Sequence, residues 1–476
     1  MRNRPRLKRD GAKPKTGIVH FGPGAFFRAF NAVYTHEAIE NAGGDWGIIA
    51  VSLRSTAARD QLLPQGGVYT SVTRTQSGTK HEIIGPIADV KVAAEDPFAV
   101  LDAMTDPSVK IVSLTITEKG YCHEPATGRL NLDHPDVIHD LAHADSPQSA
   151  IGFIVSALAR RRKADFPGFT VLSCDNLPSN GQLVRELVLE FARIIDGQLA
   201  EWIEQNASFP ATMVDRITPA TTDQDIETLG FEAGYYDPAC VAHEAFRQWV
   251  IEDNFVGGRP AWETAGAQFV TSVGAHETMK LRCLNGTHSA LAYLGYLAGY
   301  ETISECVADR HFASLCEKLW HNEIIPTLQQ PHGEDLGAYC DGLLQRYRDP
   351  TVRHRTWQIA MDGSQKLPQR ILGTITDNLA KGFVPPGLCL VVAGWMRYIG
   401  GHDESGGAID VRDPLAGRIK DICEGASDTV NALLTLEEVF PQELADSSEF
   451  QHAVAAAYRR LVTLGARASV AEFIKD

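Results

Sequence analysis

Short apolar runs rich in β-branched residues alternate with longer amphipathic stretches over the first part of the chain. This alternation is typical of a parallel sheet covered by helices, because parallel strands need a long crossover between them. The expected strands are 17–21, 46–53, 110–117, 169–174, 211–217 and 268–273. The expected helices are 25–42, 97–104, 149–164 and 182–195, where apolar residues recur at helical spacing. The pattern predicts a doubly wound α/β domain.

A hairpin is expected to interrupt this plan, with arms at 68–75 and 81–90 around the turn-rich segment QSGTK. Strand signals fade from about residue 276, and helical periodicity takes over. The expected helices of this second part are 280–300, 311–328, 336–347, 369–378 and 448–465. We therefore expect two domains, an α/β domain over 1–275 and a mostly α-helical domain over 276–476.

The charge balance excludes several classes of partner. The 476 residues include 44 Lys and Arg against 60 Asp and Glu, a formal net charge of −16. Such a surface repels polyanions, so we expect a small-molecule ligand and neither nucleic acid nor an anionic membrane as partner. Apolar runs such as 388–393 are far shorter than the roughly 20 residues of a membrane-spanning helix. The basic residues 1–16 precede no apolar signal core, which favours a solvated leader over a targeting signal.

Nine cysteines are scattered along the chain without a CxxC pair. This spacing disfavours a disulfide framework and a structural zinc site. We expect a cytoplasmic protein with reduced, mostly buried thiols and no metal cofactor. The oligomeric state stays open.

The strand at 17–21 runs directly into a glycine turn. Phe21 is followed by Gly22 and Gly24 with one proline between them, and a helical stretch comes next. A strand, a glycine turn and a helix in this order can hold a dinucleotide pyrophosphate, since glycine lets the backbone approach the phosphates. The fingerprint is incomplete, because Phe27 stands at the third glycine position of G-x-G-x-x-G. Nucleotide binding at Phe21, Gly22 and Gly24 is predicted beside the alternative of a plain strand-to-helix turn.

Arg54 follows the second expected strand, where an acidic residue would favour NAD by accepting hydrogen bonds from the adenosine ribose. An arginine there can receive the 2′-phosphate of NADP or stack on adenine, and a solvated surface arginine is an equal alternative. We expect NAD as the cofactor and leave NADP open.

Four polar residues share a face of the stretch 276–300. At about 100° per residue, Glu277, Lys280, Asn285 and His288 fall within about 140° of one another on a helix. Desolvation lowers the pKa of a lysine, so Lys280 can remove an alcohol proton near neutral pH. The amide of Asn285 can stabilise the alkoxide-like oxygen that forms as hydride leaves, and His288 can orient the hydroxyl. The alternative is a solvated or capped helix face.

Further polar residues stand at the ends of expected strands. Asn176 follows the strand at 169–174 and can supply an oxyanion donor, because the carboxyl ends of parallel strands border the ligand crevice. An Asx turn is the alternative for this residue. Glu118 and Asp215 end two other strands, where they can bind substrate hydroxyls or pair with nearby bases.

The ordered motifs of the chain resemble those of the polyol-specific long-chain dehydrogenases, the mannitol dehydrogenase family. The resemblance covers almost the whole chain and rests on HFGPGAFFRAF (20–30), SLTITEKGYC (113–122), SCDNLPSNG (173–181), MVDRITP (213–219), FRQWVIEDNFVGGRPAW (246–262), the K-x4-N-x2-H stretch and MDGSQKLPQR (361–370). It implies metal-independent, NAD(P)-linked oxidation of a secondary alcohol by a Rossmann domain and a helical substrate domain. It further implies Lys280 as general base, Asn176 and Asn285 as an oxyanion pair, His288 as an orienting group, and Glu118, Asp215, Glu277 and Lys366 as supporting or substrate-contacting residues.

Departures from the family pattern bear on the substrate. Gln358 stands where mannitol-oxidising members place an arginine, eight residues before the lysine of DGS-x-K. The segment 353–370 is more similar to the branch that interconverts D-mannonate and D-fructuronate. Lys366 and Arg370 would share a helix face, where an arginine can grip a carboxylate through a bidentate fork. Arg282 is a further candidate, and a surface charge or structural pair is the alternative for each of the three.

We therefore expect an enzyme, an NAD(P)-dependent oxidoreductase that interconverts D-mannonate and D-fructuronate with a lysine as general acid and base. Interconversion of mannitol and fructose, or reduction of another polyol or uronate, is the alternative within the same chemistry. A nucleotide-sensing protein without catalysis is the alternative from another class. Retention of Lys280, Asn285, His288 and Asn176 together argues against it.

Overall fold

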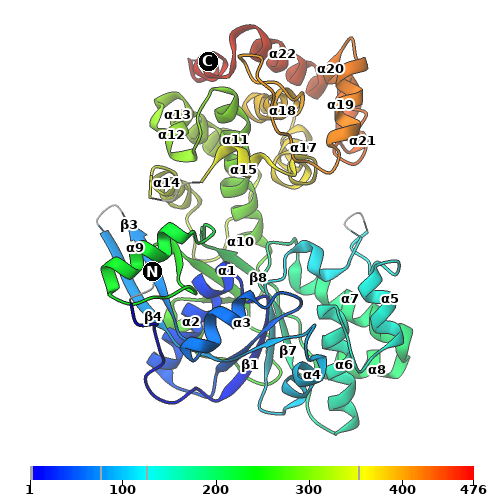
Figure 1. Cartoon of the computed structure of the whole chain (residues 1–476). Coiled ribbons are helices and arrows are strands. Elements are labelled where there is room, and N and C mark those ends of the chain that lie inside the picture. Colours follow the sequence, from blue (N-terminus) through cyan, green and yellow to red (C-terminus); the bar gives the residue numbers. More distant parts are fainter. Residues whose placement is uncertain (1–3, 76–77, 125–126, 352–353, 476) are drawn as a thin grey trace. The chain divides into compact units, whose positions relative to one another are not determined.

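The computed structural model describes residues 4–75, 78–124, 127–351 and 354–475, and its chain forms two compact units, residues 1–274 and 275–476 (Figure 1). Each unit has hydrophobic clusters of its own, and each is described here by itself. The expected turn residues Gln76 and Ser77, the leader residues 1–3 and Arg353 lie outside the described residues.

A parallel sheet forms the middle of the first unit. In the described residues its strand order is β5 (Ile87–Val92), β2 (Gly47–Ser52), β1 (Thr16–Phe21), β6 (Ile111–Leu114) and β7 (Thr170–Ser173), and every neighbouring pair is parallel. Ile18 and Val19 of β1 belong to different cores, since successive residues of a strand face opposite sides. Both faces of the sheet are therefore covered, and the predicted doubly wound domain is confirmed.

The helices of this unit divide between the two cores. One core includes residues of α1 (Ala25–Ala29), α2 (Asn31–Ala42) and α3 (Ala57–Leu62). The other includes residues of α4 (Pro97–Thr105), α5 (Pro135–Ala142), α6 (Ala150–Lys163), α7 (Asn180–Ile195) and α8 (Gly197–Asn206). The single helix expected over 25–42 is wrong in one respect, because Phe30 takes φ −130° and ψ −85° and separates α1 from α2.

Two smaller sheets stand apart from the parallel one. β8 (Thr212–Asp215) pairs antiparallel with β10 (Gln248–Glu252), which pairs with β11 (Gln268–Val270), so the strands expected at 211–217 and 268–273 belong to a separate sheet. β3 (Tyr69–Thr75) and β4 (Gly78–Ile84) form the predicted hairpin beside β9 (Val241–Glu244). The second arm was expected to reach residue 90, but it ends at Ile84. Pro86 has no N–H to continue a ladder, and β5 begins after it in the parallel sheet.

The described part of the expected leader is packed against the first unit. Leu7 is 7% exposed, and its N–H donates to Tyr236 O at 3.0 Å. Arg9 donates to three backbone oxygens, those of Gly66, Gly85 and Ile87. The expectation of a solvated leader is therefore wrong for Leu7 and Arg9, which pack against the domain. The cations Arg4, Lys8, Lys13 and Lys15 are exposed, as expected.

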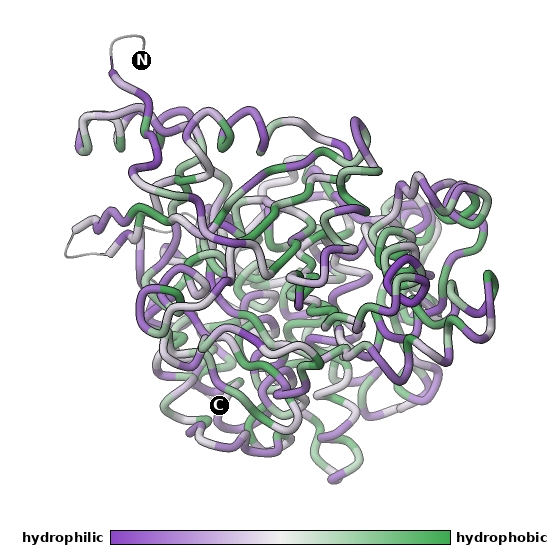
Figure 2. Tube along the Cα trace, turned by 90° about the horizontal axis from the view of Figure 1, so that it is seen from below, coloured by the Kyte–Doolittle hydropathy of each residue, from purple (hydrophilic) through white to green (hydrophobic). Residues whose placement is uncertain are grey.

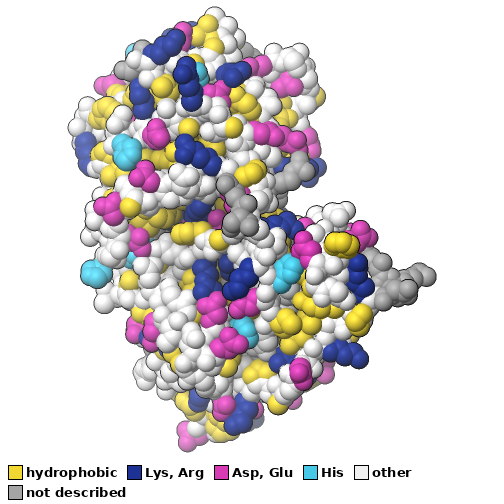
Figure 3. Space-filling view, turned by 90° about the vertical axis from the view of Figure 1, so that its left-hand side faces the viewer, with side chains coloured by type: hydrophobic (Ala, Val, Ile, Leu, Met, Phe, Trp, Pro, Cys, Tyr) yellow, Lys and Arg dark blue, Asp and Glu magenta, His cyan; other side chains and the backbone are white. Residues whose placement is uncertain are grey.

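The surface shows the mixed charge that the composition indicates. Acidic and basic side chains lie interspersed on the face drawn in Figure 3, without an extended basic stripe. In Figure 2, apolar and polar residues alternate along the helical segments, as expected for helices with one buried side. No helix in the described ranges is long and apolar enough to cross a membrane.

The second unit is helical, as predicted. Its helices are α10 (Gly274–Met279), α11 (Thr287–Leu297), α12 (Ile303–Ala308), α13 (Arg310–Lys318), α14 (Leu336–Tyr347), α15 (Thr356–Ala360), α16 (Gly363–Leu367), α17 (Gly373–Ala380), α18 (Pro386–Ile399), α19 (Ala416–Gly425), α20 (Thr429–Leu433), α21 (Gln442–Ala445), α22 (Ser448–Leu464) and α23 (Ala466–Lys475). In the described part of this unit, three π-helical segments join some of them, namely η4 (Lys280–Gly286), η5 (Leu319–Ile324) and η7 (Pro368–Leu372). The long helices expected over 280–300, 311–328 and 369–378 are therefore each interrupted or shortened.

Helix α18 lies at the centre of this unit. Most of its residues are buried, and it packs against α11 and α22, as expected for a helix that is apolar on all sides. The buried carboxylate of Glu323 accepts two N–H groups from the first turn of α18, those of Gly387 at 2.8 Å and Leu388 at 2.7 Å. Burial raises the pKa of Glu323 to about 7 in spite of these two hydrogen bonds.

Candidate active site

The glycine turn after β1 has the geometry of a nucleotide-binding turn. Gly22 has φ +90°, and a Cβ at this position would lie 2.1 Å from Thr115 O, so only glycine fits. The hydroxyl of Thr115 donates to Gly22 O at 2.8 Å and connects the turn to the end of β6. Gly24 is the N-cap of α1. The strand order reverses between β1 and β6, which is the point of an open α/β sheet where ligands bind.

An aromatic stack replaces the third glycine of the fingerprint. Phe27 is buried and stacks on the ring of His20, with centroids 3.7 Å apart and ring planes 12° apart. His20 is hydrogen-bonded to Ser113 Oγ and Thr115 Oγ1, and burial lowers its pKa to about 3, so the ring is neutral. The side chain of Phe21 is fully buried in the core, so contact with a ligand at this position has to come from the backbone.

Arg54 forms an ion pair across the carboxyl edge of the sheet. Its Nη2 donates to Asp136 Oδ2 at 2.5 Å. The side chain of Arg54 is 73% exposed, and that of Asp136 is 14% exposed. Arg54 follows β2, and Asp136 lies in the first turn of α5. The sequence carries no signal for this pairing, because the two residues are far apart along the chain and belong to no shared motif.

Asp175 fastens the loops that follow β6 and β7. Its carboxylate accepts the N–H groups of Ile116 and Thr117 at 2.9 and 3.0 Å and the hydroxyl of Tyr121 at 2.7 Å. Burial raises the pKa of Asp175. The predicted site residues Glu118 and Asn176 are exposed on these two connected loops. Asp175 is thus a positioning residue that motif reading left unassigned.

Asp215 lies in a different environment from Glu118. It ends β8 in the smaller sheet and is 3% exposed, whereas Glu118 is at the surface. The side-chain amide of Asn180 donates to Asp175 O at 3.0 Å and to Thr212 O at 2.9 Å. These bonds link the end of the parallel sheet to the strand that carries Asp215.

A π-helical turn contains the predicted lysine and asparagine of the second unit and directly precedes the histidine. Lys280 and Asn285 belong to η4, and His288 follows in the first turn of α11. All three are buried. The expected spacing of about 100° per residue does not hold here, because π-helical hydrogen bonds join residues five apart instead of four. Residues five apart, such as Lys280 and Asn285, therefore come closer to a common face than on a regular helix.

A second π-helical turn packs against the first. Pro368 begins η7, and it has no N–H to give to a regular helical hydrogen bond. At Gly286, the last residue of η4, a Cβ would lie 3.0 Å from Arg370 O, so glycine permits the close approach of the two segments. The guanidinium of Arg370 is partly buried and donates to Ser289 Oγ at 3.3 Å. Among the described residues it forms no ion pair.

His288 is surrounded by cations and rings. Burial, followed by the charges of His354, Arg346, Arg370 and Lys280, holds the pKa of His288 well below its usual range. Its ring lies 5.0 Å from that of His354, and its Nε2 has no hydrogen-bond partner within the described ranges. Burial also lowers the pKa of His354 to about 4. Arg346 belongs to no recognised motif. His354 lies in the segment 353–370 but received no role from it, so the fold identifies both residues as neighbours of His288.

The remaining predicted cations differ in their partners. Lys366 donates to Ile359 O at 3.3 Å and Met361 O at 2.5 Å, and burial and the charge of Arg370 lower its pKa to about 8. Arg282 is paired with Asp377 at 2.6 Å, so its charge is already neutralised within the protein. The structure therefore separates Arg370 from the other two.

Two other predicted positions lie near this cluster in sequence. Glu277 is half-buried in α10, and Gln358 is exposed on α15. Gly363 of the DGS-x-K motif has no room for a side chain, because a Cβ would lie 2.5 Å from Trp395 Nε1 and 2.7 Å from the hydroxyl of Tyr293. The motif glycine is thus needed for packing beside the site.

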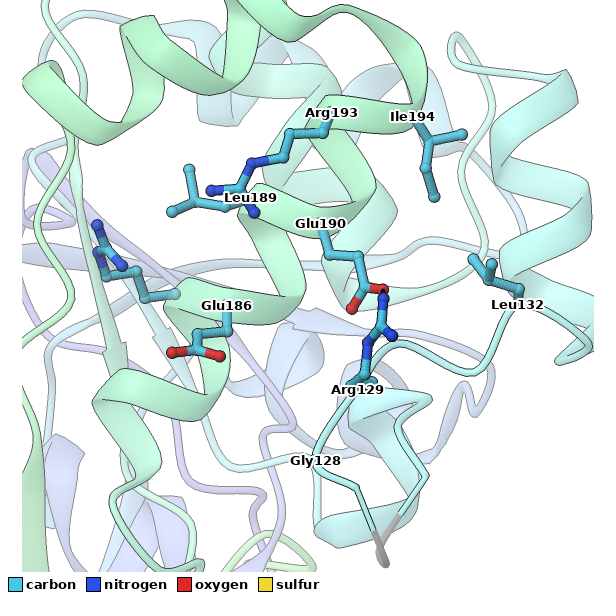
Figure 4. A pocket seen from close by; sticks show the side chains of 9 residues that line it. Gly128, Arg129, Leu132, Glu186, Leu189, Glu190, Arg193 and Ile194 are labelled. Atoms are coloured by element: carbon cyan, nitrogen blue, oxygen red, sulfur yellow. Dashed lines mark hydrogen bonds and ion pairs between the residues drawn. The ribbon is translucent and has the colours of Figure 1, made fainter.

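An open pocket of about 630 Å³ lies elsewhere on the first unit, between α7 and the loop before α5 (Figure 4). Arg129 reaches across it to Glu190 at 2.7 Å, and Leu132 and Ile194 line its rim. It contains none of the predicted site residues. Arg129 and Glu190 neutralise each other's charge, and we assign no ligand to this pocket.

Comparisons with known proteins agree with this architecture. The family profile "Mannitol dehydrogenase Rossmann domain" matches residues 16–264, and the profile "Mannitol dehydrogenase C-terminal domain" matches residues 272–462. The chain is 48% identical to D-mannonate oxidoreductase of Escherichia coli K12 over 97% of its length and 96% of that protein. It is 38% identical to mannitol 2-dehydrogenase of Phaeosphaeria nodorum over 98% of its length and 83% of that protein. The solved ternary complex of Pseudomonas fluorescens mannitol 2-dehydrogenase with NAD and D-mannitol superposes with a TM-score of 0.88 at 37% identity, covering 100% of this chain and 97% of that chain.

Proposed function

The chain belongs to the mannitol dehydrogenase family of oxidoreductases, and on this premise we propose that it interconverts D-mannonate and D-fructuronate with NAD as the hydride carrier. In the oxidative direction, C5 of D-mannonate loses a hydride to NAD and its hydroxyl loses a proton. The products are the ketone of D-fructuronate, NADH and H⁺. The identity to the E. coli D-mannonate oxidoreductase supports this substrate pair.

The first unit contains residues that fit a dinucleotide. Gly22 occupies a turn that has no room for a Cβ, and Gly24 begins α1 at the switch point between β1 and β6. We assign these two glycines to the pyrophosphate. Such a cofactor, when bound, supplies the acceptor or donor of the hydride.

The Arg54–Asp136 pair supports NAD over NADP. Arg54 follows β2, the position from which Rossmann domains contact the adenosine ribose. A 2′-phosphate held by Arg54 would come close to the carboxylate of Asp136, with which the arginine is paired at 2.5 Å. The two like charges repel, whereas a ribose hydroxyl can donate a hydrogen bond to the carboxylate. We therefore expect the pair to favour the unphosphorylated cofactor.

The polar residues of η4 and α11 can perform the proton transfer. We assign Lys280 as the base that takes the C5 hydroxyl proton in oxidation and as the acid that returns it in reduction. The amide of Asn285 then stabilises the developing oxyanion. The low pKa of His288 keeps its ring neutral, so it can orient the hydroxyl without adding a further positive charge. Family resemblance assigns Asn176 the same role as Asn285.

A single observation carries the choice of a sugar acid over a neutral polyol. Arg370 is partly buried next to His288, and it has one hydrogen bond and no acidic partner in the described chain. A partly buried guanidinium without a counter-ion favours a ligand that brings a carboxylate. Lys366 stands nearby, but backbone carbonyls already accept its hydrogens. We assign the carboxylate of mannonate to Arg370.

Parallel kinetic assays test this function. NADH and NADPH oxidation is followed with D-fructuronate, D-tagaturonate and D-fructose, and NAD reduction with D-mannonate. We expect the highest kcat/KM for fructuronate with NADH. Efficient turnover of fructose without turnover of either uronate would refute the sugar-acid assignment. Lys280→Ala should lower kcat strongly with nearly unchanged NADH affinity, and an unchanged kcat would remove the lysine from proton transfer.

Mannitol oxidation is the second candidate, because a mannitol 2-dehydrogenase superposes closely on the whole chain. The assay panel separates it directly, since it requires fructose turnover. A nucleotide-sensing protein would bind NADH tightly and turn over none of these substrates.

A further inference from the structure

Three potential metal ligands meet beside the parallel sheet. Cys122 follows the short 3₁₀ turn after β6, His134 is the N-cap of α5, and Asp136 lies in the first turn of that helix. One ligand atom of each residue lies within 4.8 Å of the other two. Cys122 is buried, and the other two residues are partly exposed, so the cluster is reachable from solvent on one side.

The three side chains form a donor set suited to Zn²⁺. Zinc binds thiolate sulfur at about 2.3 Å and imidazole nitrogen or carboxylate oxygen at about 2.0–2.2 Å, in a tetrahedral arrangement. Ligand atoms around such an ion stand about 3.5 Å apart. The atoms of Cys122, His134 and Asp136 need to move by only about 1 Å to reach that spacing. We propose that this cluster binds one Zn²⁺ ion, with water as the fourth ligand.

Metal binding would exchange one hydrogen bond of the cluster. His134 Nδ1 accepts the N–H of Asp136 at 3.2 Å, so an ion at Nδ1 has to replace this N–H as the partner of the lone pair. Asp136 uses Oδ2 for Arg54, which leaves Oδ1 for a metal. A guanidinium on the outer oxygen is the type of contact that orients a ligating carboxylate. Binding deprotonates Cys122 and releases its proton to solvent.

The ion would fasten the loop after β6 to the start of α5. It performs no step of the proposed reaction. Asp136 also takes part in the proposed choice of cofactor, so the site is tested by metal binding and thermal stability and not by activity. The sequence pattern argued against a zinc site because it lacks a CxxC pair. The fold supplies the proximity that the spacing of Cys122 and His134 does not indicate.

Metal titration of the full-length protein tests the site. After treatment with a chelator and gel filtration, Co²⁺ is added and the thiolate-to-cobalt charge-transfer absorption is recorded. We expect one Co²⁺ per chain, displaced by one equivalent of Zn²⁺, and a Tm that rises by several degrees with Zn²⁺. Cys122→Ser should abolish the absorption and the Tm increase. His134→Gln should weaken binding at least tenfold.

Cys240→Ser is the matched control, because Cys240 is also a buried thiol of the first unit but lies outside the cluster. It should bind Co²⁺ like the wild type. Absence of the charge-transfer band in the wild type would overturn the proposal, and so would a band that persists in Cys122→Ser. If Cys122→Ser does not fold, wild-type affinity in His134→Gln would overturn it equally.

Discussion

Replacement of Arg370 by methionine tests how the protein would recognise a carboxylate. Arg370 makes one hydrogen bond, to Ser289 Oγ at 3.3 Å, so its removal breaks little within the protein. A bidentate pair with a substrate carboxylate consists of two charge-assisted hydrogen bonds of about 1.5–3 kcal/mol each. Partial exposure places the pair toward the lower end of that range, at about 3–4 kcal/mol in total. This corresponds to a loss of about 10²- to 10³-fold in kcat/KM.

The assay compares D-fructuronate with D-fructose, which carries CH₂OH in place of the carboxylate. Initial rates of NADH oxidation give kcat/KM for both ketoses. In Arg370→Met the value for fructuronate should fall by the factor above, and the value for fructose should stay within about threefold, since fructose never used the charge. NADH affinity should be unchanged.

Arg282→Met provides the matched control. Arg282 also lies in a π-helical segment, but its charge is paired with Asp377. Its loss should affect both ketoses by the same factor. Equal losses for fructuronate and fructose in Arg370→Met would refute the reasoning and assign Arg370 a structural role. Unchanged kinetics with fructuronate would place the carboxylate elsewhere.

Three further predictions follow from other contacts. Gly286→Ala places a Cβ 3.0 Å from Arg370 O, so the two π-helical segments must move apart by about 0.4 Å. We expect steady-state kinetics to show a roughly tenfold lower kcat and thermal unfolding to show an unchanged Tm. The pKa of Glu323 is raised from 4.5 to about 7 in the folded state, so between these pH values the folded chain keeps a proton that the unfolded chain releases. The free energy of unfolding should therefore fall by at most about 3 kcal/mol as the pH rises from 4.5 to 7. Urea unfolding of Glu323→Gln should lack this decrease, and an identical slope in the variant would contradict the assignment. In Asp136→Asn, measured with EDTA present, the ratio of kcat/KM with NADPH to kcat/KM with NADH should rise about tenfold. An unchanged ratio would show that the pair with Arg54 does not determine the cofactor preference.

The sequence predicted the parts of the fold that depend on local pattern. Buried runs such as the one around Val19 appear as strands of the parallel sheet, because both of its faces are covered. Strand pairing was harder to predict. The segment that ends at Asp215 pairs antiparallel with the strand that begins at Gln248, and no local signal specifies that partner. The contacts of Arg9 could not be predicted for a similar reason, since the carbonyl groups that it binds come from distant segments.

The candidate site shows the same limit at the level of side chains. Motifs selected Lys280 and His288, but they gave no indication of a π-helical turn, whose cause lies partly in the packing of Gly286 against another segment. Arg282 and Arg370 were equivalent cations in the sequence. Only the position of Asp377 shows that one is neutralised within the protein and the other is not.

The π-helical turn at Lys280–Gly286 has a consequence for how this gene can change. A π-helical turn contains one residue more than the α-helical turn that it replaces. Deletion of a single codon in this stretch would restore regular helical hydrogen bonds, but it would also move residues out of the close packing of Gly286 against Arg370. The same deletion would rotate His288 by about 100° relative to Lys280. On the proposed roles of Lys280 and His288, selection for activity would maintain the extra residue, and its loss in a related gene would mark a copy released from catalysis.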